Sequence, residues 1–498
     1  MKLKGPLANS YPGAVALVVF ALVPYLALST ALVPLTPVLS KSLGLSEQSL
    51  QLTNGMANAA YAFGTVLAVQ LAVHLPGRRL LVLYASLFVV ASVLAATAWT
   101  SGLFIAGRVT QGLCTSLMLI AAVPPLVIGW PVAKMRWTAG TMNLCIFGAV
   151  ALGPVIGGVQ AQAHAWRPLF WIIAGVSGLA LLFALLTFED QPPQDRSAPW
   201  DWVAQVLAGL GCAAAFFGAS ELQTHALLSL IVFAPLLGGA AMIVLLLLVE
   251  YAIDRPLFPV RSLMSTLPLA GVLIAMCAGA ASVALVELAQ SALQSKVSPG
   301  HMAMLFWPEF GAAVVTAVFF GLILRTRLIP VLALSGLVAL SAGAIVLSGV
   351  ASGGDSLVAV GSGLVGLGVG ASVSPALFTA GFSLASDQIQ RVFAVVELLR
   401  GVAAFMFAPI VLHLSKTVAQ DPAAGIRVGV WLCFGVAAGG AFLASYIYAL
   451  GRLRLRPPKL ERWLAGDGPA FDSPKLAAGV RGELPLAPLD RGDSAHTA

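Results

Sequence analysis

The chain contains about fourteen apolar stretches, each long enough to cross a bilayer, separated by short polar segments. A backbone in hydrocarbon must satisfy its own hydrogen bonds, and successive segments of this length do so as helices. Only 9% of the residues are charged, against roughly a quarter in soluble domains. The sequence therefore predicts an all-α integral membrane protein. The stretches are expected near 13–38, 50–74, 79–99, 102–130, 137–161, 168–188, 200–220, 226–249, 265–292, 302–324, 328–349, 356–382, 391–413 and 428–450.

Lysine and arginine are distributed unequally between the two sets of alternate loops. One set carries Lys2, Lys4, Arg78, Arg79, Lys134, Arg136, Arg196, Arg255, Arg261, Arg325, Arg327, Arg391, Arg452, Arg454 and Arg456. The other set carries only Lys41, Arg167, Lys296, Lys416 and Arg427. The positive-inside rule places the richer set in the cytoplasm, and an even number of spans then puts both termini there. The net charge of +7 reflects basic residues crowded on one side of a membrane and does not indicate nucleic-acid binding. The expected location is a plasma membrane, or a bacterial inner membrane.

The stretches group into two six-helix bundles, at residues 1–188 and 265–450, with a linker and two additional helices, central in the sequence, at 189–264. The bundles are expected to surround a central cavity, and the two additional helices to pack outside it. Each bundle has a basic turn between its second and third helices, at 76–79 and 325–327. Repeated halves around a central site are typical of secondary transporters, although a basic turn can occur in any cytoplasmic loop. Residues 451–498 are rich in Pro, Gly, Asp and Arg and are predicted to form a disordered cytoplasmic tail.

The fifth stretch contains Gly153, Pro154, Gly157 and Gly158 within six residues. Glycine and proline destabilise the interior of a soluble helix. In a membrane helix, Gly153 and Gly157 allow a neighbouring helix to approach closely, and Pro154 introduces a kink. We expect this span to contact a helix of the second half of the chain, in the eighth or tenth span. A tight crossing without a functional role is the alternative.

Five charged residues lie inside apolar stretches, where an unpaired charge is costly. Glu287 is the first candidate for a proton carrier, because no base lies near it in sequence and a low dielectric favours a neutral carboxyl group. Glu309 is the reserve candidate. The alternative is that its carboxylate, near a helix start, is stabilised by the helix dipole and water and has no role in transport. Glu397 and Arg400 are spaced to form an ion pair on one helix face. Arg108 has no acid within one turn, which favours a role in the transport pathway.

Other kinds of chemistry find no support in the sequence. The five cysteines all fall inside apolar stretches, so a disulfide framework is not expected. Neither they nor the six histidines show metal-ligand spacing, and we expect no metal and no cofactor. The chain has no phosphate-binding Gly-Lys-Ser/Thr loop and no nucleophile constellation, which argues against an enzyme and against direct use of ATP.

Several local motifs, taken together, resemble those of the major facilitator superfamily, and specifically its fourteen-span drug:proton antiporter branch, over residues 13–450. The matching segments are Arg108-x-x-Gln111-Gly112, Gly153-Pro154-x-x-Gly157-Gly158, Trp166-Arg167-x-x-Phe170, Asp254-Arg255-Pro256-Leu257-Phe258, Gln290 with Trp307-Pro308, and Leu398-Leu399-Arg400-Gly401. The resemblance implies that Arg108 serves proton coupling and that the glycine–proline run is the antiporter motif. It places Gln111 and Gln290 in a substrate cavity, and gives Arg78, Arg79, Glu397 and Arg400 gating or structural ion pairs.

Two segments depart from this branch. The loop motif usually has an aspartate before its basic residues, but the corresponding position is near Val73. The first span usually carries an aspartate and an asparagine, and residues 28–34 contain neither. Two parts of the gating and proton machinery of this branch are therefore missing or moved. The primary expectation is a proton-coupled exporter of small amphipathic or toxic compounds that works by alternating access. The alternatives are an importing or uncoupled transporter of one metabolite and a non-transporting receptor. Expected partners are the substrate, protons, the lipid bilayer and, in a double-membrane bacterium, a periplasmic adaptor.

Overall fold

The computed structural model describes residues 5–187, 189, 198–294, 296–350 and 354–477. Over these residues the chain is largely helical, and fourteen helices are long and apolar enough to cross a membrane. The predicted all-α membrane fold is therefore confirmed. Most of the expected stretches match the helices within a few residues, but the first and thirteenth helices extend further, over Tyr11–Leu43 and Ser386–Thr417.

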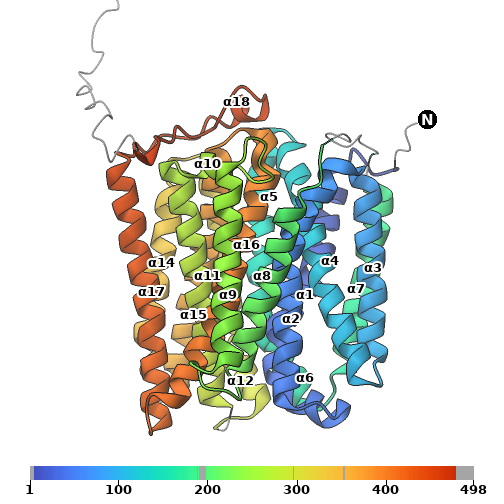
Figure 1. The fold of residues 1–498 in the computed structure, drawn as a ribbon, viewed down its shortest axis with the longest axis vertical. Coiled ribbons are helices and arrows are strands. Elements are labelled where there is room, and N and C mark those ends of the chain that lie inside the picture. Colours follow the sequence, from blue (N-terminus) through green and yellow to red (C-terminus); the bar gives the residue numbers. More distant parts are fainter. Residues whose placement is uncertain (1–4, 188, 190–197, 295, 351–353, 478–498) are drawn as a thin grey trace, which may run out of the picture.

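The first six spans form one bundle (Figure 1). Its helices are α1 (Tyr11–Leu43), α2 (Glu47–His74), α3 (Gly77–Thr97), α4 (Ser101–Ile128), α5 (Val132–Asn143), the π-helical turn η1 (Leu144–Gly148), α6 (Ala149–Gln162) and α7 (Arg167–Thr187). Because α5, η1 and α6 are continuous, they make a single span.

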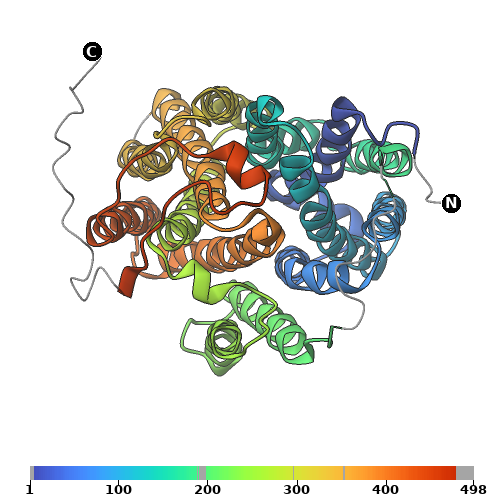
Figure 2. The same cartoon turned by 90° about the horizontal axis from the view of Figure 1, so that it is seen from above.

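The last six spans form the second bundle. Its helices are α11 (Thr266–Leu293), α12 (Pro299–Leu305), α13 (Trp307–Ile323), α14 (Ile329–Leu347), α15 (Asp355–Phe382), the short 3-10 turn η2 (Ser386–Gln388), α16 (Ile389–Thr417) and α17 (Pro422–Leu450). Between the bundles in sequence come α8 (Trp202–Glu221), α9 (Leu230–Ala252) and the short α10 (Val260–Leu263). Figure 2 shows the α8–α9 pair at the edge of the molecule, where α8 packs against α2 and α16.

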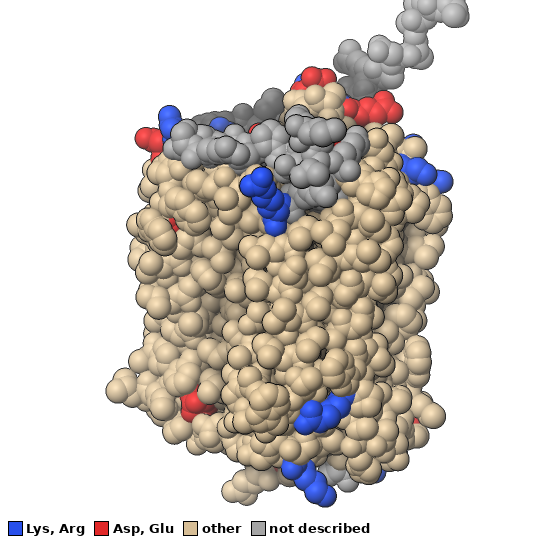
Figure 3. All heavy atoms as spheres, turned by 90° about the vertical axis from the view of Figure 1, so that its right-hand side faces the viewer, with Lys and Arg blue, Asp and Glu red and all other residues tan. Residues whose placement is uncertain are grey.

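On the face drawn in Figure 3, exposed charged side chains lie mainly near the two ends of the molecule and leave an apolar band between them. The first described residues and the segment that follows α17 lie at the same end, together with α10 and α18 (Leu460–Leu464) (Figure 1). We call this the terminal end and the other the opposite end.

Pro154 interrupts the hydrogen bonding of α6, because it has no N–H to donate to the carbonyl group of Val150. Thr30 of α1 compensates, since its Oγ1 donates to Val150 O at 2.7 Å. A Cβ added at Gly153 would lie 2.5 Å from Ala27 O, and one at Gly157 would lie 2.8 Å from Ala31 Cα. The α1 and α6 backbones therefore approach closely, and a threonine replaces the missing donor.

This packing corrects part of the expected contact of the fifth span. Gly153 and Gly157 face α1 of the same bundle, and only Gly158 faces the second bundle. A Cβ at Gly158 would lie 2.7 Å from Pro299 O and 2.9 Å from Ala303 Cβ, in α12 at the start of the tenth span. The reason is geometric, because residues 153 and 157 are four apart and share one helix face, whereas residue 158 is turned away from it.

Substitutions at the two neighbouring glycines should have different effects. Gly157→Leu should lower the stability of the first bundle by at least about 1–3 kcal/mol, because added side-chain atoms would meet the α1 backbone. Gly158→Leu should affect the contact between the bundles instead. Thermal unfolding in detergent checks the first expectation. Gly175→Leu is the control, because a Cβ there meets no atom of the described residues within 4 Å. Equal melting temperatures for Gly157→Leu and Gly175→Leu would contradict the close packing.

The segment after α17 also differs from expectation. Over residues 451–477 it packs onto the terminal end, and residues 478–498 lie outside the described residues. Trp463 is fully buried, donates from Nε1 to Leu384 O at 2.8 Å, and has its ring centroid 4.9 Å from that of Phe382. Ala470 N and Phe471 N both donate to Phe382 O, at 2.7 and 3.1 Å. The buried side chains of Trp463 and Phe471 thus anchor this segment, although its Pro- and Gly-rich composition indicates disorder.

Candidate functional site

A small cavity of about 50 Å³ lies between the two bundles, lined by residues from α1, α2, η1, α6, α11, α13, α15 and α16. Its apolar wall includes Phe147 and Phe405. The polar side chains that line it are Ser29, Thr30, Asn54, Asn58, Ser282, Glu287, Gln290 and Glu309. Three residues singled out from the sequence, Glu287, Gln290 and Glu309, therefore meet at one site.

A larger cavity of about 640 Å³ adjoins the small one and shares Asn54, Asn58, Glu287 and Phe405 with it. Its other lining residues run along α2, α8 and α16 to the α8–α9 turn. Gln223 and Thr224 of that turn are exposed, so the larger cavity reaches the surface at the opposite end. Glu287 lies where the two cavities meet.

The larger cavity corrects the expected position of the two additional spans. They lie at the edge of the molecule, as expected, but α8 is not outside the cavity. Phe216, Ala219 and Ser220 of α8 form part of the wall of the larger cavity. The close packing of α8 on α2 explains this, because α8 then closes the gap between α2 and α16.

The acidic and amide groups of the small cavity have free hydrogen-bonding capacity. Glu309 and Gln290 are 3% and 2% exposed, and neither Glu309 Oε2 nor Gln290 Oε1 has a hydrogen-bond partner among the residues that the structure describes. Glu287 is half-buried, and the described residues give it no ion pair within 4.0 Å. A buried polar atom without a partner is costly. These three side chains are therefore available to a ligand, a proton or water.

The bundles are in contact between the small cavity and the terminal end. Asn143 Nδ2 of α5 donates to Gly370 O of α15 at 3.0 Å. Next to it, α5 and α13 pack backbone to backbone, because a Cβ at Gly140 would lie 3.0 Å from Ala317 O and one at Gly321 would lie 2.8 Å from Arg136 O. The site is therefore closed on this side and open towards the opposite end.

Arg108 of α4 is completely buried in the first bundle. Its Nη1 donates to Gln111 Oε1 at 3.0 Å, and its guanidinium lies 5.1 Å from the ring centroid of Tyr25. Its Nε and Nη2 have no partner within the described part of the chain. Arg108 thus lies in the core of the first bundle, and within the described residues its guanidinium keeps two donor groups without a partner.

Gln111 does not line the cavity, which corrects the expectation for this residue. It is fully buried, and its Nε2 donates to Ser92 Oγ of α3 at 2.9 Å. Both ends of the amide are occupied, because Oε1 accepts from Arg108. Gln111 therefore holds Arg108 in place and does not face the space between the bundles.

A chain of polar contacts links Arg108 to the cavity wall. Tyr25, which lies under the guanidinium, donates from its hydroxyl group to Asn58 Oδ1 at 3.3 Å. Asn58 lines both cavities. Arg108 therefore does not line the cavity itself, but contacts it through Tyr25 and Asn58.

Glu397 and Arg400 form the ion pair that their spacing predicts, with Nη2 2.5 Å from Glu397 Oε2. The pair lies at the boundary between the bundles. Tyr61 of α2 donates from its hydroxyl group to Glu397 Oε2 at 3.3 Å, and Arg400 Cζ is 5.9 Å from the ring centroid of Phe147. Any separation of the bundles at this level must break the Tyr61 contact. The gating role of the pair stays a prediction.

The expected ion pairs of the first basic loop are not found for Arg79. Arg79 is exposed at the start of α3, and no acid within the described ranges lies within 4.0 Å of it. The physical reason is the missing aspartate, since Val73 offers no charge. The side chain of Arg78 lies outside the described residues.

Sequence reasoning missed the polar face of α2. Gln51, Asn54, Asn58 and Tyr61 are spaced three, four and three residues apart, which places them on one side of a helix. This pattern within an otherwise apolar helix was available from the sequence. Glu250 was also missed; it is fully buried at the terminal end of α9 and accepts from Phe258 N at 2.9 Å. It therefore fixes the turn that leads into α10.

Known sequences match most of the chain. The profile of the Major Facilitator Superfamily matches residues 18–408. An uncharacterized MFS-type transporter of Bacillus subtilis (strain 168), YubD, is 27% identical over 270 residues, which are 54% of this chain and 53% of YubD. The lincomycin resistance protein LmrB of Listeria innocua is 24% identical over 35% of this chain and 37% of its own length. The chain thus spans about half or less of these curated relatives.

Solved structures show the same fold at low identity. The human organic anion transporter MFSD10 (TETRAN) superposes with a TM-score of 0.63 at 16% identity, over 87% of this chain and 99% of that one. The peptide transporter POT in complex with sulfate superposes with a TM-score of 0.59 at 16% identity, over 88% and 94% of the two chains. At these identities the likeness concerns the fold alone.

Proposed function

Because the chain belongs to the major facilitator superfamily and is a transporter, not an enzyme, we propose that it exports small amphipathic or toxic compounds in exchange for protons by alternating access. One observation carries the proposal. Glu287, Glu309 and Gln290 meet in a cavity between two bundles, and this cavity is open towards one end and closed towards the other. Relatives named as a lincomycin resistance protein and as efflux proteins support export.

The chemistry of the cavity supports an amphipathic substrate. Ligand sites are mostly apolar, with a few polar groups that fix orientation. Here Phe147, Phe405 and Val286 supply apolar contact, and the amide of Gln290 can bind a polar group of the substrate. Substrate and proton then compete for the same region, because Glu287 lines both cavities.

Protonation can drive the change of access through the cost of burying charge. When the cavity is open to the opposite end, Glu287 is reached by water and can exchange a proton there. Closing that end around a neutral carboxyl group costs less than closing it around a carboxylate. Arg108 contributes to this balance through Tyr25 and Asn58, because its fixed charge favours negative charge at the cavity wall.

A second candidate is an uncoupled or importing transporter of a specific metabolite. The first span supports this candidate. It lines the cavity with the neutral side chains of Ser29 and Thr30, whereas the antiporter branch usually has an acid in this span. If neither Glu287 nor Glu309 exchanges protons, this transporter has no coupling group in the cavity. Flux of one metabolite that ignores the proton gradient distinguishes this candidate.

Uptake of a dye into inverted membrane vesicles tests the proposal. Vesicles that contain the protein should accumulate lipophilic dyes or antibiotics from a panel when a proton gradient is imposed, and should lose them when an ionophore collapses the gradient. A deletion strain should be more sensitive to the same compounds. Accumulation that persists without a gradient would support the second candidate.

We extend the proposal to location: a plasma membrane, or a bacterial inner membrane, with both termini in the cytoplasm. The unequal distribution of basic residues supports it. In a double-membrane bacterium, a periplasmic adaptor at the opposite end would receive the exported compound.

Cysteine labelling checks this orientation. Thr224→Cys, on the exposed α8–α9 turn, should react in intact cells with a membrane-impermeant maleimide. Arg327→Cys, exposed at the terminal end, should react only after the membrane is opened. The native cysteines give little background, because four are buried and Cys277 is half-buried. The reverse pattern of labelling would contradict the orientation.

A further inference from the structure

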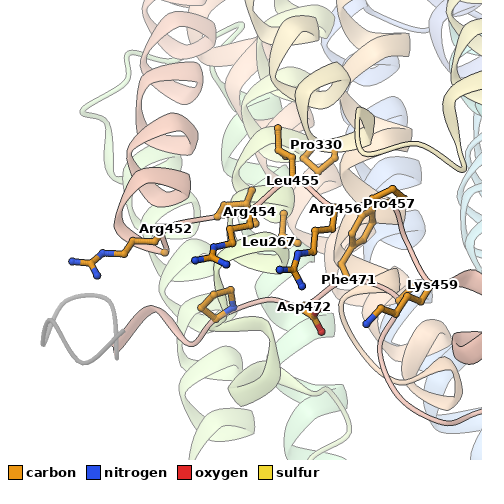
Figure 4. A pocket seen from close by; sticks show the side chains of 14 residues that line it. Leu267, Pro330, Arg452, Arg454, Leu455, Arg456, Pro457, Lys459, Phe471 and Asp472 are labelled. Atoms are coloured by element: carbon orange, nitrogen blue, oxygen red, sulfur yellow. The ribbon is translucent and has the colours of Figure 1, made fainter. Parts of the chain in front are cut away.

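A third cavity, of about 360 Å³, lies away from the space between the bundles, under the segment that follows α17. Residues 451–459 form one side of it and residues 470–474 another. Leu267 at the start of α11 and Pro330 at the start of α14 close its base (Figure 4). Because α11, α14 and α17 are all membrane-length helices that begin or end here, the cavity lies at the expected boundary between hydrocarbon and water.

The charge around this cavity is predominantly positive. Arg454, Arg456 and Lys459 line it and are exposed, and Asp472 is the one acid among its described lining residues. Figure 4 shows Arg454 and Arg456 extending to the same side of the segment, with Lys459 and Asp472 nearby, while Arg452 points away. No ion pair within 4.0 Å joins the first three to an acid of the described residues. Three cationic groups are therefore available to a ligand.

Part of the cavity lining is apolar. Leu267, Leu453 and Phe471 belong to it, and Phe471 is 5% exposed. A ligand that fits must therefore combine a negatively charged group with a hydrocarbon part. A phospholipid headgroup together with the first carbons of its acyl chains has this combination.

The cavity is held in shape by hydrogen bonds that do not use its cationic groups. Thr266 Oγ1 and N contact Pro474 O at 2.9 and 3.0 Å, and Leu267 N donates to Ser473 Oγ at 2.9 Å. Lys459 N donates to Ala470 O at 3.0 Å, which joins the two sides of the segment. A ligand therefore meets a prearranged site, which reduces the ordering cost of binding.

We propose that this cavity binds the headgroup phosphate of an anionic phospholipid, with Arg454 and Arg456 as its main ligands and Lys459 as a further cation. Guanidinium groups match phosphate oxygens in a two-pronged geometry. Anionic lipids attract basic residues at the membrane surface, which brings them to a site placed at this boundary. The site is separate from the transport cavity and does not depend on the proposed transport cycle.

Native mass spectrometry of the full-length protein, after removal of copurified lipid, tests the site. The protein should retain phosphatidylglycerol at least about tenfold more strongly than phosphatidylcholine, since each basic group near the surface favours an anionic lipid. Arg456→Gln should reduce this preference about fivefold. Arg456→Lys should reduce it less, because the charge remains while the planar fork is lost.

Arg427→Gln is the matched control, because Arg427 is an exposed arginine at the opposite end of α17. It should leave the preference unchanged. Equal retention of the two lipids by the unaltered protein, or equal effects of Arg456→Gln and Arg427→Gln, would overturn the proposal.

A separate experiment adds inorganic phosphate or glycerol 3-phosphate as a competitor. If millimolar concentrations of either displace all bound phosphatidylglycerol, the site binds a soluble phosphate and the lipid assignment is wrong.

Discussion

Glu287→Gln is expected to abolish proton-driven accumulation of substrate and to keep passive exchange. Glutamine retains nearly the same size and can still hydrogen-bond, but it cannot release a proton. Glu287 lies where the two cavities meet and has no ion pair among the described residues, so its charge is not already neutralised by a neighbour. Uptake into inverted vesicles at several external pH values measures the effect, and the variant should accumulate substrate no better than vesicles without the protein.

The control for this substitution is Glu47→Gln, because Glu47 is exposed at the start of α2. This substitution makes the same chemical change outside both cavities, and the variant should transport normally. Glu309→Gln tests the reserve candidate. If Glu287→Gln keeps a normal pH dependence and Glu309→Gln loses it, the proton carrier is Glu309, and if both keep it, neither carboxyl group carries the proton.

Arg108→Ala should also eliminate active transport while the protein remains inserted in the membrane. The guanidinium is fully buried, holds Gln111 and lies over Tyr25, so its loss removes the fixed charge behind the cavity wall. Two of its donor groups have no partner within the described part of the chain. A buried charge with incomplete hydrogen bonds contributes little to stability. We therefore expect Arg108→Ala to lower the transport rate strongly and the melting temperature only slightly. Efflux and melting temperature, measured on the same preparation, separate the two effects.

Arg108→Lys and Arg427→Ala complete this comparison. Lysine keeps the charge but cannot reproduce the planar contact with Tyr25, so transport should be partly restored. Arg427 is exposed, and its alanine variant should behave normally. Unchanged efflux in Arg108→Ala would leave this residue a structural role only.

The sequence was sufficient to predict the membrane class and the fourteen spans, because hydrocarbon thickness and backbone hydrogen bonding restrict what an apolar segment can do. It also predicted the ion pair of Glu397 and Arg400, since a spacing of three residues decides this contact locally. Glu287 and Glu309 were recognised as candidates because an acid within an apolar stretch is conspicuous without knowledge of its neighbours.

Contacts between distant segments could not be predicted in the same way. Gln111 and Arg108 share one helix, but only the position of α3 decides that Ser92 occupies the amide of Gln111. Similarly, the partner of Gly157 depends on how α1 and α6 pack. The segment after α17 was mispredicted because two aromatic side chains, Trp463 and Phe471, outweigh a composition typical of disorder.

Proton movement measured together with substrate movement tests the central claim most directly. The purified protein is placed in proteoliposomes with a pH-sensitive dye inside, and a panel of lipophilic dyes and antibiotics is added without an imposed gradient. We predict that at least one compound will drive protons in the direction opposite to its own movement, and that Glu287→Gln will abolish this proton flux. Transport of a compound with no accompanying proton movement, at a rate that an imposed pH gradient does not change, would contradict the account.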